Sequence, residues 1–196
     1  MKFNYPQAEW KLIFSCIVAG KNAKFAENAT NALLMYPSHV TEGTVEIPQR
    51  LISPFETLRW YIDLGVLMNK LQGARTGNYR KLDLCFRTLV NRQLDIATCS
   101  VEDLERTHGI GPKTSRFFIL WTRPGAQHAA LDVHVLRWLR HQGHVAPRST
   151  PTGGRYAALE RIFIDYAASW GLTPRELDAR IWDCGRLGGM YAHSST

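Results

Sequence analysis

The chain has 196 residues, which is enough for one sizeable hydrophobic core or for two smaller lobes. Its 45% apolar and 21% charged residues are typical of a globular protein and exclude wholesale disorder. The chain has 24 Lys and Arg against 17 Asp and Glu, a formal charge of 24 − 17 = +7. This charge favours a polyanionic partner, most often nucleic acid.

No apolar run is long enough to cross a bilayer, and the N-terminal sequence lacks a signal-peptide pattern. We therefore expect an intracellular protein of the cytoplasm and nucleoid, or of the nucleus in a eukaryote. The four cysteines are single and widely spaced, which predicts reduced, mostly buried thiols and neither a zinc nor an iron–sulfur site. His141 and His144 lack an evident carboxylate or cysteine partner, so we expect no metal site.

Helix signals follow one another along the chain. Apolar residues from Trp10 to Val18 recur at helical spacing, and capping boxes stand at Ser53–Glu56 and Thr173–Glu176. The one extended-looking stretch, 44–52, contains Pro48, which argues against a central strand. We predict an all-α fold of two helical lobes. The predicted helices lie near residues 10–18, 24–35, 53–65, 78–92, 100–109, 112–121, 132–142, 155–170 and 174–184.

A glycine turn, Gly109-Ile110-Gly111, joins two of these predicted helices. Glycines permit positive φ and close approach of another backbone, and the N–H groups at the next helix start form an anion site suited to a DNA phosphate. Taken alone, the glycines fit an ordinary helical hairpin equally well.

Lys113 lies in the first turn of the helix that follows this hairpin turn. The positive end of a helix disfavours an ammonium group, so we expect a lowered pKa and a larger fraction of free amine. A free amine is the nucleophile of Schiff-base chemistry. The alternative is a surface lysine that touches phosphate as a point charge.

Asp132 follows Lys113 by 132 − 113 = 19 residues and stands between apolar residues, so we expect it to be half-buried. As an N-cap it would accept backbone N–H bonds that keep it ionised. An ionised carboxylate can stabilise a cationic sugar as a base departs, or take a proton from an attacking amine. The alternative is a purely structural cap, which is the stronger reading for Asp132 alone.

Together, the stretch Thr107–Ser115 and the stretch Leu131–Arg137 resemble the helix-hairpin-helix, Gly/Pro-Asp superfamily of DNA glycosylases. The resemblance is to the lysine-bearing branch of endonuclease III and 8-oxoguanine DNA glycosylase, and it covers about residues 10–142. It implies that Lys113 is the Schiff-base nucleophile and Asp132 the essential carboxylate. His108, Pro112 and the missing iron–sulfur cysteines depart from the family pattern.

The resemblance also implies which residues contact DNA. The hairpin would bind a phosphate, a loop after the first core helix would fill the gap left by an extruded base, and a second loop would face the DNA. The implied contacts are Gly109, Ile110, Gly111 and Thr114 in the hairpin, Lys21 and Asn22 in the gap-filling loop, and Tyr79 and Arg80 in the second loop.

Four residues are candidates for a base pocket. Phe117 and Trp121 lie one and two turns after Lys113, and Asp178 and Trp182 are four residues apart on the last predicted helix. Aromatic stacking and a carboxylate would suit a flipped base. Core packing is an equal alternative for the two tryptophans and the favoured one for Phe117.

We therefore predict a bifunctional DNA glycosylase with AP-lyase activity, without cofactor or metal. It would be a monomer that binds double-stranded DNA holding a damaged or modified base. The 196 residues would form one unit with lobes 24–121, including the hairpin 101–121, and 1–23 plus 122–196. Two alternatives are open: group transfer onto a DNA base on the same fold, and a helix-hairpin-helix DNA-binding protein without chemistry.

Overall fold

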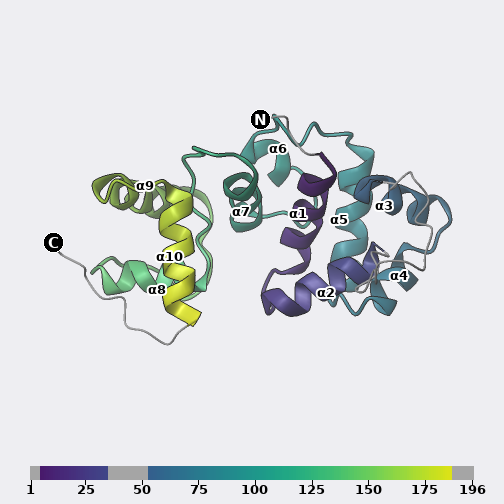
Figure 1. The fold of residues 1–196 in the computed structure, drawn as a ribbon, viewed down its shortest axis with the longest axis horizontal. Helices are drawn as coiled ribbons and strands as arrows, with labels where there is room; N and C mark the ends of the chain where they lie inside the picture. Colours follow the sequence, from purple (N-terminus) through teal and green to yellow (C-terminus); the bar gives the residue numbers. More distant parts are fainter. Residues whose placement is uncertain (1–4, 35–52, 187–196) are drawn as a thin grey trace, which may run out of the picture. The chain divides into compact units, whose positions relative to one another are not determined.

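A computed structural model describes residues 5–34 and 53–186 (Figure 1). Every regular element within these residues is an α-helix, which confirms the all-α prediction; the stretch 44–52 lies outside them. The helices are α1 (Tyr5–Ile17), α2 (Ala23–Leu33), α3 (Pro54–Asp63), α4 (Leu67–Gly73), α5 (Tyr79–Asn91), α6 (Val101–Glu105), α7 (Pro112–Thr122), α8 (Val133–His141), α9 (Gly153–Ser169) and α10 (Pro174–Arg186).

Local capping explains where several helices begin. Ser53 Oγ accepts from the backbone N–H of Glu56 (3.2 Å), and Glu56 Oε2 accepts from the N–H of Ser53 (2.8 Å). Thr173 and Glu176 exchange the same two bonds at the start of α10 (3.2 and 2.7 Å). Both predicted capping boxes are thus confirmed. They satisfy N–H groups that have no acceptor within the helix.

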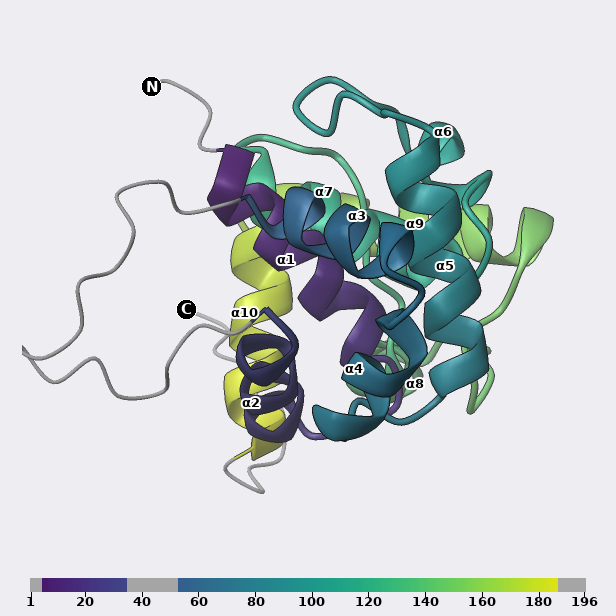
Figure 2. The same cartoon turned by 90° about the vertical axis from the view of Figure 1, so that its right-hand side faces the viewer.

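The chain divides into two compact units, Met1–Ile110 and Gly111–Thr196. In the first unit, α1 packs on α2 and α3, and α5 packs on α3 and α4 (Figure 2). Fully buried side chains from three of these helices meet in the core: Leu12 and Ile17 of α1, Leu58 and Tyr61 of α3, and Phe86 of α5.

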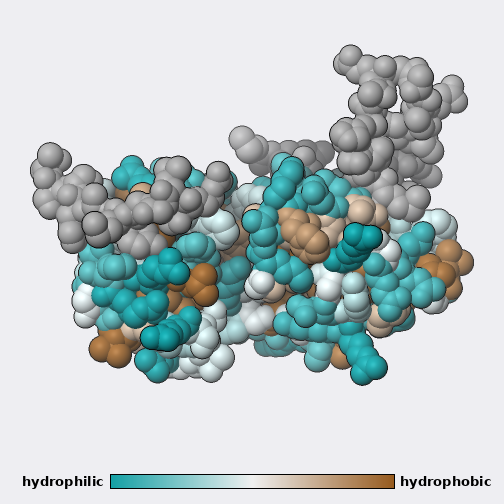
Figure 3. Space-filling view, turned by 90° about the horizontal axis from the view of Figure 1, so that it is seen from below, coloured by the Kyte–Doolittle hydropathy of each residue, from teal (hydrophilic) through white to brown (hydrophobic). Residues whose placement is uncertain are grey.

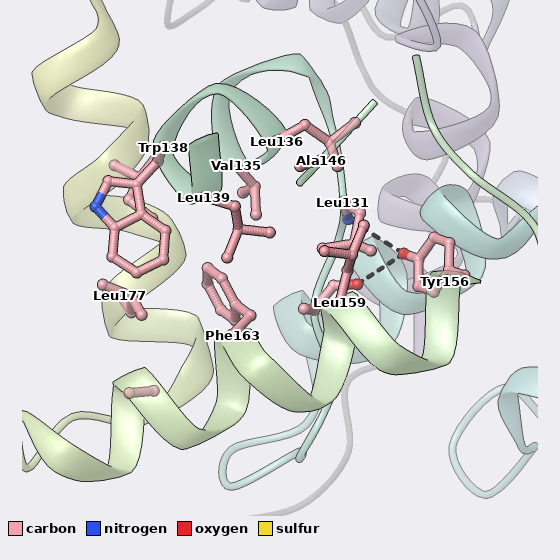
Figure 4. Close-up of a cluster of buried hydrophobic side chains, with 13 residues drawn as sticks. Leu131, Val135, Leu136, Trp138, Leu139, Ala146, Tyr156, Leu159, Phe163 and Leu177 are labelled. Carbon is pink, nitrogen blue, oxygen red and sulfur yellow. Dashed lines mark hydrogen bonds between the residues drawn. The ribbon is translucent and has the colours of Figure 1, made fainter. Parts of the chain in front are cut away.

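In the second unit, α10 packs on α7, α8 and α9. Apolar side chains of α8 and α9 form its core, among them Leu139, Trp138 and Phe163 (Figure 4). This division differs from the predicted lobes, 24–121 and 1–23 plus 122–196. The apolar face of α1 is buried within the first unit, so the segment 1–23 belongs with the residues up to 110. The helix α7 packs within the second unit, so the segment 112–121 belongs with the residues after it.

Hydrophilic residues cover most of the face shown in Figure 3, where apolar residues form several separate patches. None of the described helices has the length and apolar character needed to cross a membrane. Cys16, Cys85 and Cys99 are buried free thiols, as predicted, whereas Cys184 is exposed.

Candidate active site

Lys113 is the second residue of α7, which starts with Pro112 after the N-cap Gly111. Glycine has no side chain to cap the first turn, and this turn contains no acidic residue. The side chain of Lys113 lies against the next turn of α7, with Nζ 4.9 Å from the ring centroid of Phe117. The ammonium group therefore makes a cation–π contact with a residue of the same helix.

The pKa of Lys113 is lowered, as the sequence predicted, but the cause is different. Burial of the ammonium lowers the pKa, while the negative charges of Asp132 and Asp178 act in the opposite direction without cancelling the effect. The prediction named the positive end of α7 as the cause, because burial cannot be seen from local sequence. The result is an amine that loses its proton more readily than a free lysine.

Asp132 is the N-cap of α8 and is more buried than predicted, with 9% of its surface exposed. Oδ1 accepts from the backbone N–H of His134 (2.8 Å) and of Val135 (2.9 Å). Oδ2 accepts from the indole N–H of Trp182 (2.9 Å). Both oxygens are acceptors, so the carboxylate is fixed at the start of α8 from two directions.

Asp178 lies one turn before Trp182 on α10. Its Oδ1 atom is buried and has no hydrogen-bond partner. Burial is the main cause that raises the pKa of this carboxyl, the charge of Asp132 adds to the rise and Lys113 opposes it, and together they bring the pKa to about 7. The second unit thus brings one amine and two carboxyl groups into electrostatic contact.

The aromatic candidates lie around this group. Phe117 and Trp121 are in ring contact, with centroids 5.4 Å apart. The ring centroids of Trp182 and His134 are 4.9 Å apart, and the indole N–H of Trp182 also donates to Asp132. All four predicted pocket residues therefore belong to the same unit as Lys113. Trp121 and Trp182 are both partly exposed, which distinguishes them from the fully buried core aromatics.

Tyr156 of α9 holds the segment that leads to Asp132 (Figure 4). Its hydroxyl donates to the carbonyl oxygen of Ala129 (2.7 Å) and accepts from the N–H of Leu131 (3.1 Å). The same oxygen lies 3.3 Å from the carbonyl oxygen of Pro112. One side chain thus connects the residue before Lys113 with the residues before Asp132.

Glu160, one turn further along α9, holds the same segment. It accepts from Arg116 Nε (2.8 Å) and from the N–H of Ala129 (3.0 Å), and it lies 3.2 Å from Nδ1 of His128. Burial by itself would raise the pKa of Glu160, but the hydrogen bonds from His128, Ala129 and Arg116 outweigh it, so the pKa is lowered. Sequence analysis missed Tyr156 and Glu160, because their partners are 25 or more residues away.

The predicted hairpin residues belong to both units, Gly109 and Ile110 to the first and Gly111 and Thr114 to the second. Gly109 has φ +84°, in the left-handed region that glycine permits, whereas Gly111 has φ −104° and an extended backbone that any residue could adopt. The N–H groups of Ile110 and Thr114 donate to the carbonyl oxygens of Thr107 and Gly111. These two amides are therefore already satisfied within the protein.

The other predicted DNA contacts lie in the first unit. Oδ1 of Asn22 accepts from the N–H groups of Lys24 (2.9 Å) and Phe25 (3.2 Å), so this side chain caps α2. In the free protein this cap occupies the side-chain oxygen of Asn22. Lys21 Nζ donates to the carbonyl oxygen of Ile17 (2.8 Å), and Tyr79 and Arg80 form the first turn of α5.

No family model matches the chain, and no solved structure matches it. Within residues 5–34 and 53–186, no group of three or more His, Cys, Asp and Glu side chains is arranged to hold a metal ion. The assignment of a function therefore depends on the chemistry of the residues around Lys113.

Proposed function

We propose that the protein is a bifunctional DNA glycosylase and AP lyase of the helix-hairpin-helix, Gly/Pro-Asp type. The observation that carries the proposal is the grouping of Lys113, Asp132 and Asp178 within one compact unit, where burial lowers the pKa of the amine. Lysine amines with lowered pKa values are characteristic of Schiff-base catalysis. The resemblance of the sequence around Lys113 and Asp132 to this superfamily supports the same assignment.

In the proposed reaction, the lone pair of Lys113 Nζ attacks C1′ of a deoxyribose. The bond from C1′ to the base breaks, and its electron pair leaves with the base. Asp132 faces the positive charge that develops on the sugar and stabilises it. Its three hydrogen bonds hold the carboxylate in place, so little reorganisation is needed as the charge develops.

Asp178 provides a group that can receive the proton lost by Lys113. A carboxyl with a pKa of about 7 is partly ionised at neutral pH, so it can accept a proton and release it again. After ring opening gives an imine between Lys113 and C1′, loss of a C2′ proton and departure of the 3′ phosphate would nick the strand. Hydrolysis of the imine would then return the amine.

A flipped base would have aromatic faces and a carboxyl available near Lys113. Phe117, Trp121 and Trp182 offer rings for stacking, and the unpaired Oδ1 of Asp178 can accept a hydrogen bond. The net charge of +7 supports double-stranded DNA as the partner. No residue of the proposed reaction requires a metal or an organic cofactor.

Product analysis tests the proposal. A panel of duplexes, each with one lesion or one modified base, is incubated with the protein and then examined on a denaturing gel and by mass spectrometry. A free base together with a nicked strand is the expected product. An intact strand of changed mass would establish group transfer instead, and DNA binding with no change in any duplex would leave a non-catalytic binding protein.

A further inference from the structure

Two lysines of the first unit approach each other beside two glycine turns. Lys21 follows α1, and Lys81 lies in the first turn of α5. A Cβ atom added to Gly77 would lie 3.2 Å from Cε of Lys21, and one added to Gly109 would lie 3.3 Å from Cε of Lys81. Each lysine stem therefore packs over a glycine, at φ +65° and +84° respectively, where a larger residue would displace it.

Lys21 lies beside the start of α5, since a Cβ added to Gly77, the residue before the N-cap Asn78, would be 3.8 Å from its Nζ. Burial lowers the pKa of Lys21, and the positive charge of Lys81 lowers it further. Among the described residues, neither lysine has a carboxylate within salt-bridge distance. The contact made by Lys21 Nζ is to a neutral acceptor, the carbonyl oxygen of Ile17.

The start of α5 adds to the same positive charge. Its first turn contains Arg80 and Lys81 and no acidic residue, and the N-cap Asn78 makes no side-chain hydrogen bond to the helix. Basic residues at a helix N-terminus are destabilising, because they face the positive end of the helix dipole. Asp83, the next acidic residue of α5, is paired with Arg87 at 2.9 Å. A bound anion would relieve the repulsion that the free protein carries here.

We infer that Lys21 and Lys81 together bind one phosphodiester group of a nucleic-acid backbone. An ammonium group is a compact point charge suited to phosphate oxygens, and phosphate contacts position a protein on DNA without reading its sequence. Lys21 would then contact the backbone, and it would not fill the gap left by a flipped base. The inference rests on the DNA partner of the proposed function, but it does not depend on any chemistry at Lys113.

The salt dependence of DNA binding tests the inference. Binding of a duplex is measured by fluorescence anisotropy between about 50 and 200 mM salt for the wild type, Lys21→Met, Lys81→Met and the double variant. Loss of this one phosphate contact should reduce the slope of log K against log salt concentration by about 0.9 in the double variant, and each single variant should lose part of that amount. Methionine keeps most of the apolar stem that packs on each glycine.

Lys70→Met is the matched control, because Lys70 is an exposed lysine of the same unit whose Nζ lies 5.2 Å from the ring centroid of Tyr61. Its slope should equal that of the wild type. Lys81→Arg should keep the wild-type slope, which separates loss of charge from loss of folding. Thermal unfolding gives a second readout, because removing one of two repelling charges should not lower the melting temperature of the free protein.

An unchanged slope in the double variant would overturn the phosphate site, and so would an equal loss of slope in Lys70→Met. The proposed chemistry is judged separately, on saturating protein and lesion-containing DNA. Variants with a reduced slope and intact base release support both proposals, whereas a reduced slope in a protein that releases no base supports the phosphate site alone. A wild type that binds no nucleic acid would refute both.

Discussion

Replacing Asp178 by asparagine should stabilise the folded protein, and the gain should increase with pH. The carboxyl of Asp178 is buried and near the negative charge of Asp132, which together raise its pKa from 3.8 to about 7. A pKa that is higher in the folded state than in the unfolded state means that folding favours the protonated form. Stability is therefore lost as the pH rises from about 4 through about 7, and the loss is complete above that range.

The magnitude follows from the two pKa values. Each pKa unit corresponds to about 1.36 kcal/mol, so the difference between 3.8 and about 7 sets a limit of about 4 kcal/mol. About two thirds of the pH range between these two pKa values lies between about pH 5 and about pH 7. The advantage of Asp178→Asn over the wild type should therefore grow by about 2–3 kcal/mol between about pH 5 and about pH 8.

Urea-induced unfolding, followed by circular dichroism at these pH values, measures the effect. Asp183→Asn is the control, because Asp183 is an exposed aspartate on the same helix. The advantage over the wild type should grow more with pH for Asp178→Asn than for Asp183→Asn. A constant difference for Asp178→Asn would refute the reasoning, since it would mean that Asp178 is not forced to ionise in a buried site.

Three further substitutions test the arrangement around the proposed site. Tyr156→Phe removes the hydroxyl that bonds Ala129 and Leu131, so it should lower the free energy of unfolding by about 1–3 kcal/mol and lower kcat more than it raises KM. Gly109→Ala places a Cβ at φ +84° against Lys81 and should cost about 1–2 kcal/mol in urea unfolding. Asp132→Asn keeps an acceptor for the α8 cap but turns an amide N–H toward the indole N–H of Trp182, so it should lose about 1–3 kcal/mol of stability and slow single-turnover base release by about 3–5 kcal/mol in activation free energy. Stability unchanged in the first two, or wild-type base release in the third, would contradict these assignments.

Features encoded by neighbouring residues could be predicted from the sequence. The caps at Ser53, Thr173 and Asp132 each depend on residues within three positions, and all three form as predicted. The helix α4 was missed, because it begins at Leu67 after Val66, which provides no capping side chain. Its buried leucines, Leu67 and Leu71, were the available signal.

Features that depend on residues far apart in the chain could not be predicted. The bond between Trp182 and Asp132 spans 50 residues, and the burial that lowers the pKa of Lys113 depends on the packing of the whole second unit. The capping role of Asn22 is local, and its position directly before a predicted helix indicated it. The sequence analysis gave Asn22 a DNA-contacting role instead, because of the resemblance to known glycosylases. Tyr156 and Glu160 act through contacts with segments that have no motif of their own.

Trapping with borohydride tests the central claim most directly, because it detects the imine between Lys113 and the sugar. Wild-type protein is incubated with lesion-containing duplexes in the presence of borohydride, and a covalent protein–DNA adduct is expected for at least one lesion. Lys113→Gln should bind the same duplex and form no adduct, while the control Lys70→Gln should form it normally. An adduct that survives in Lys113→Gln, or a wild type that gives none with any lesion, would contradict the account.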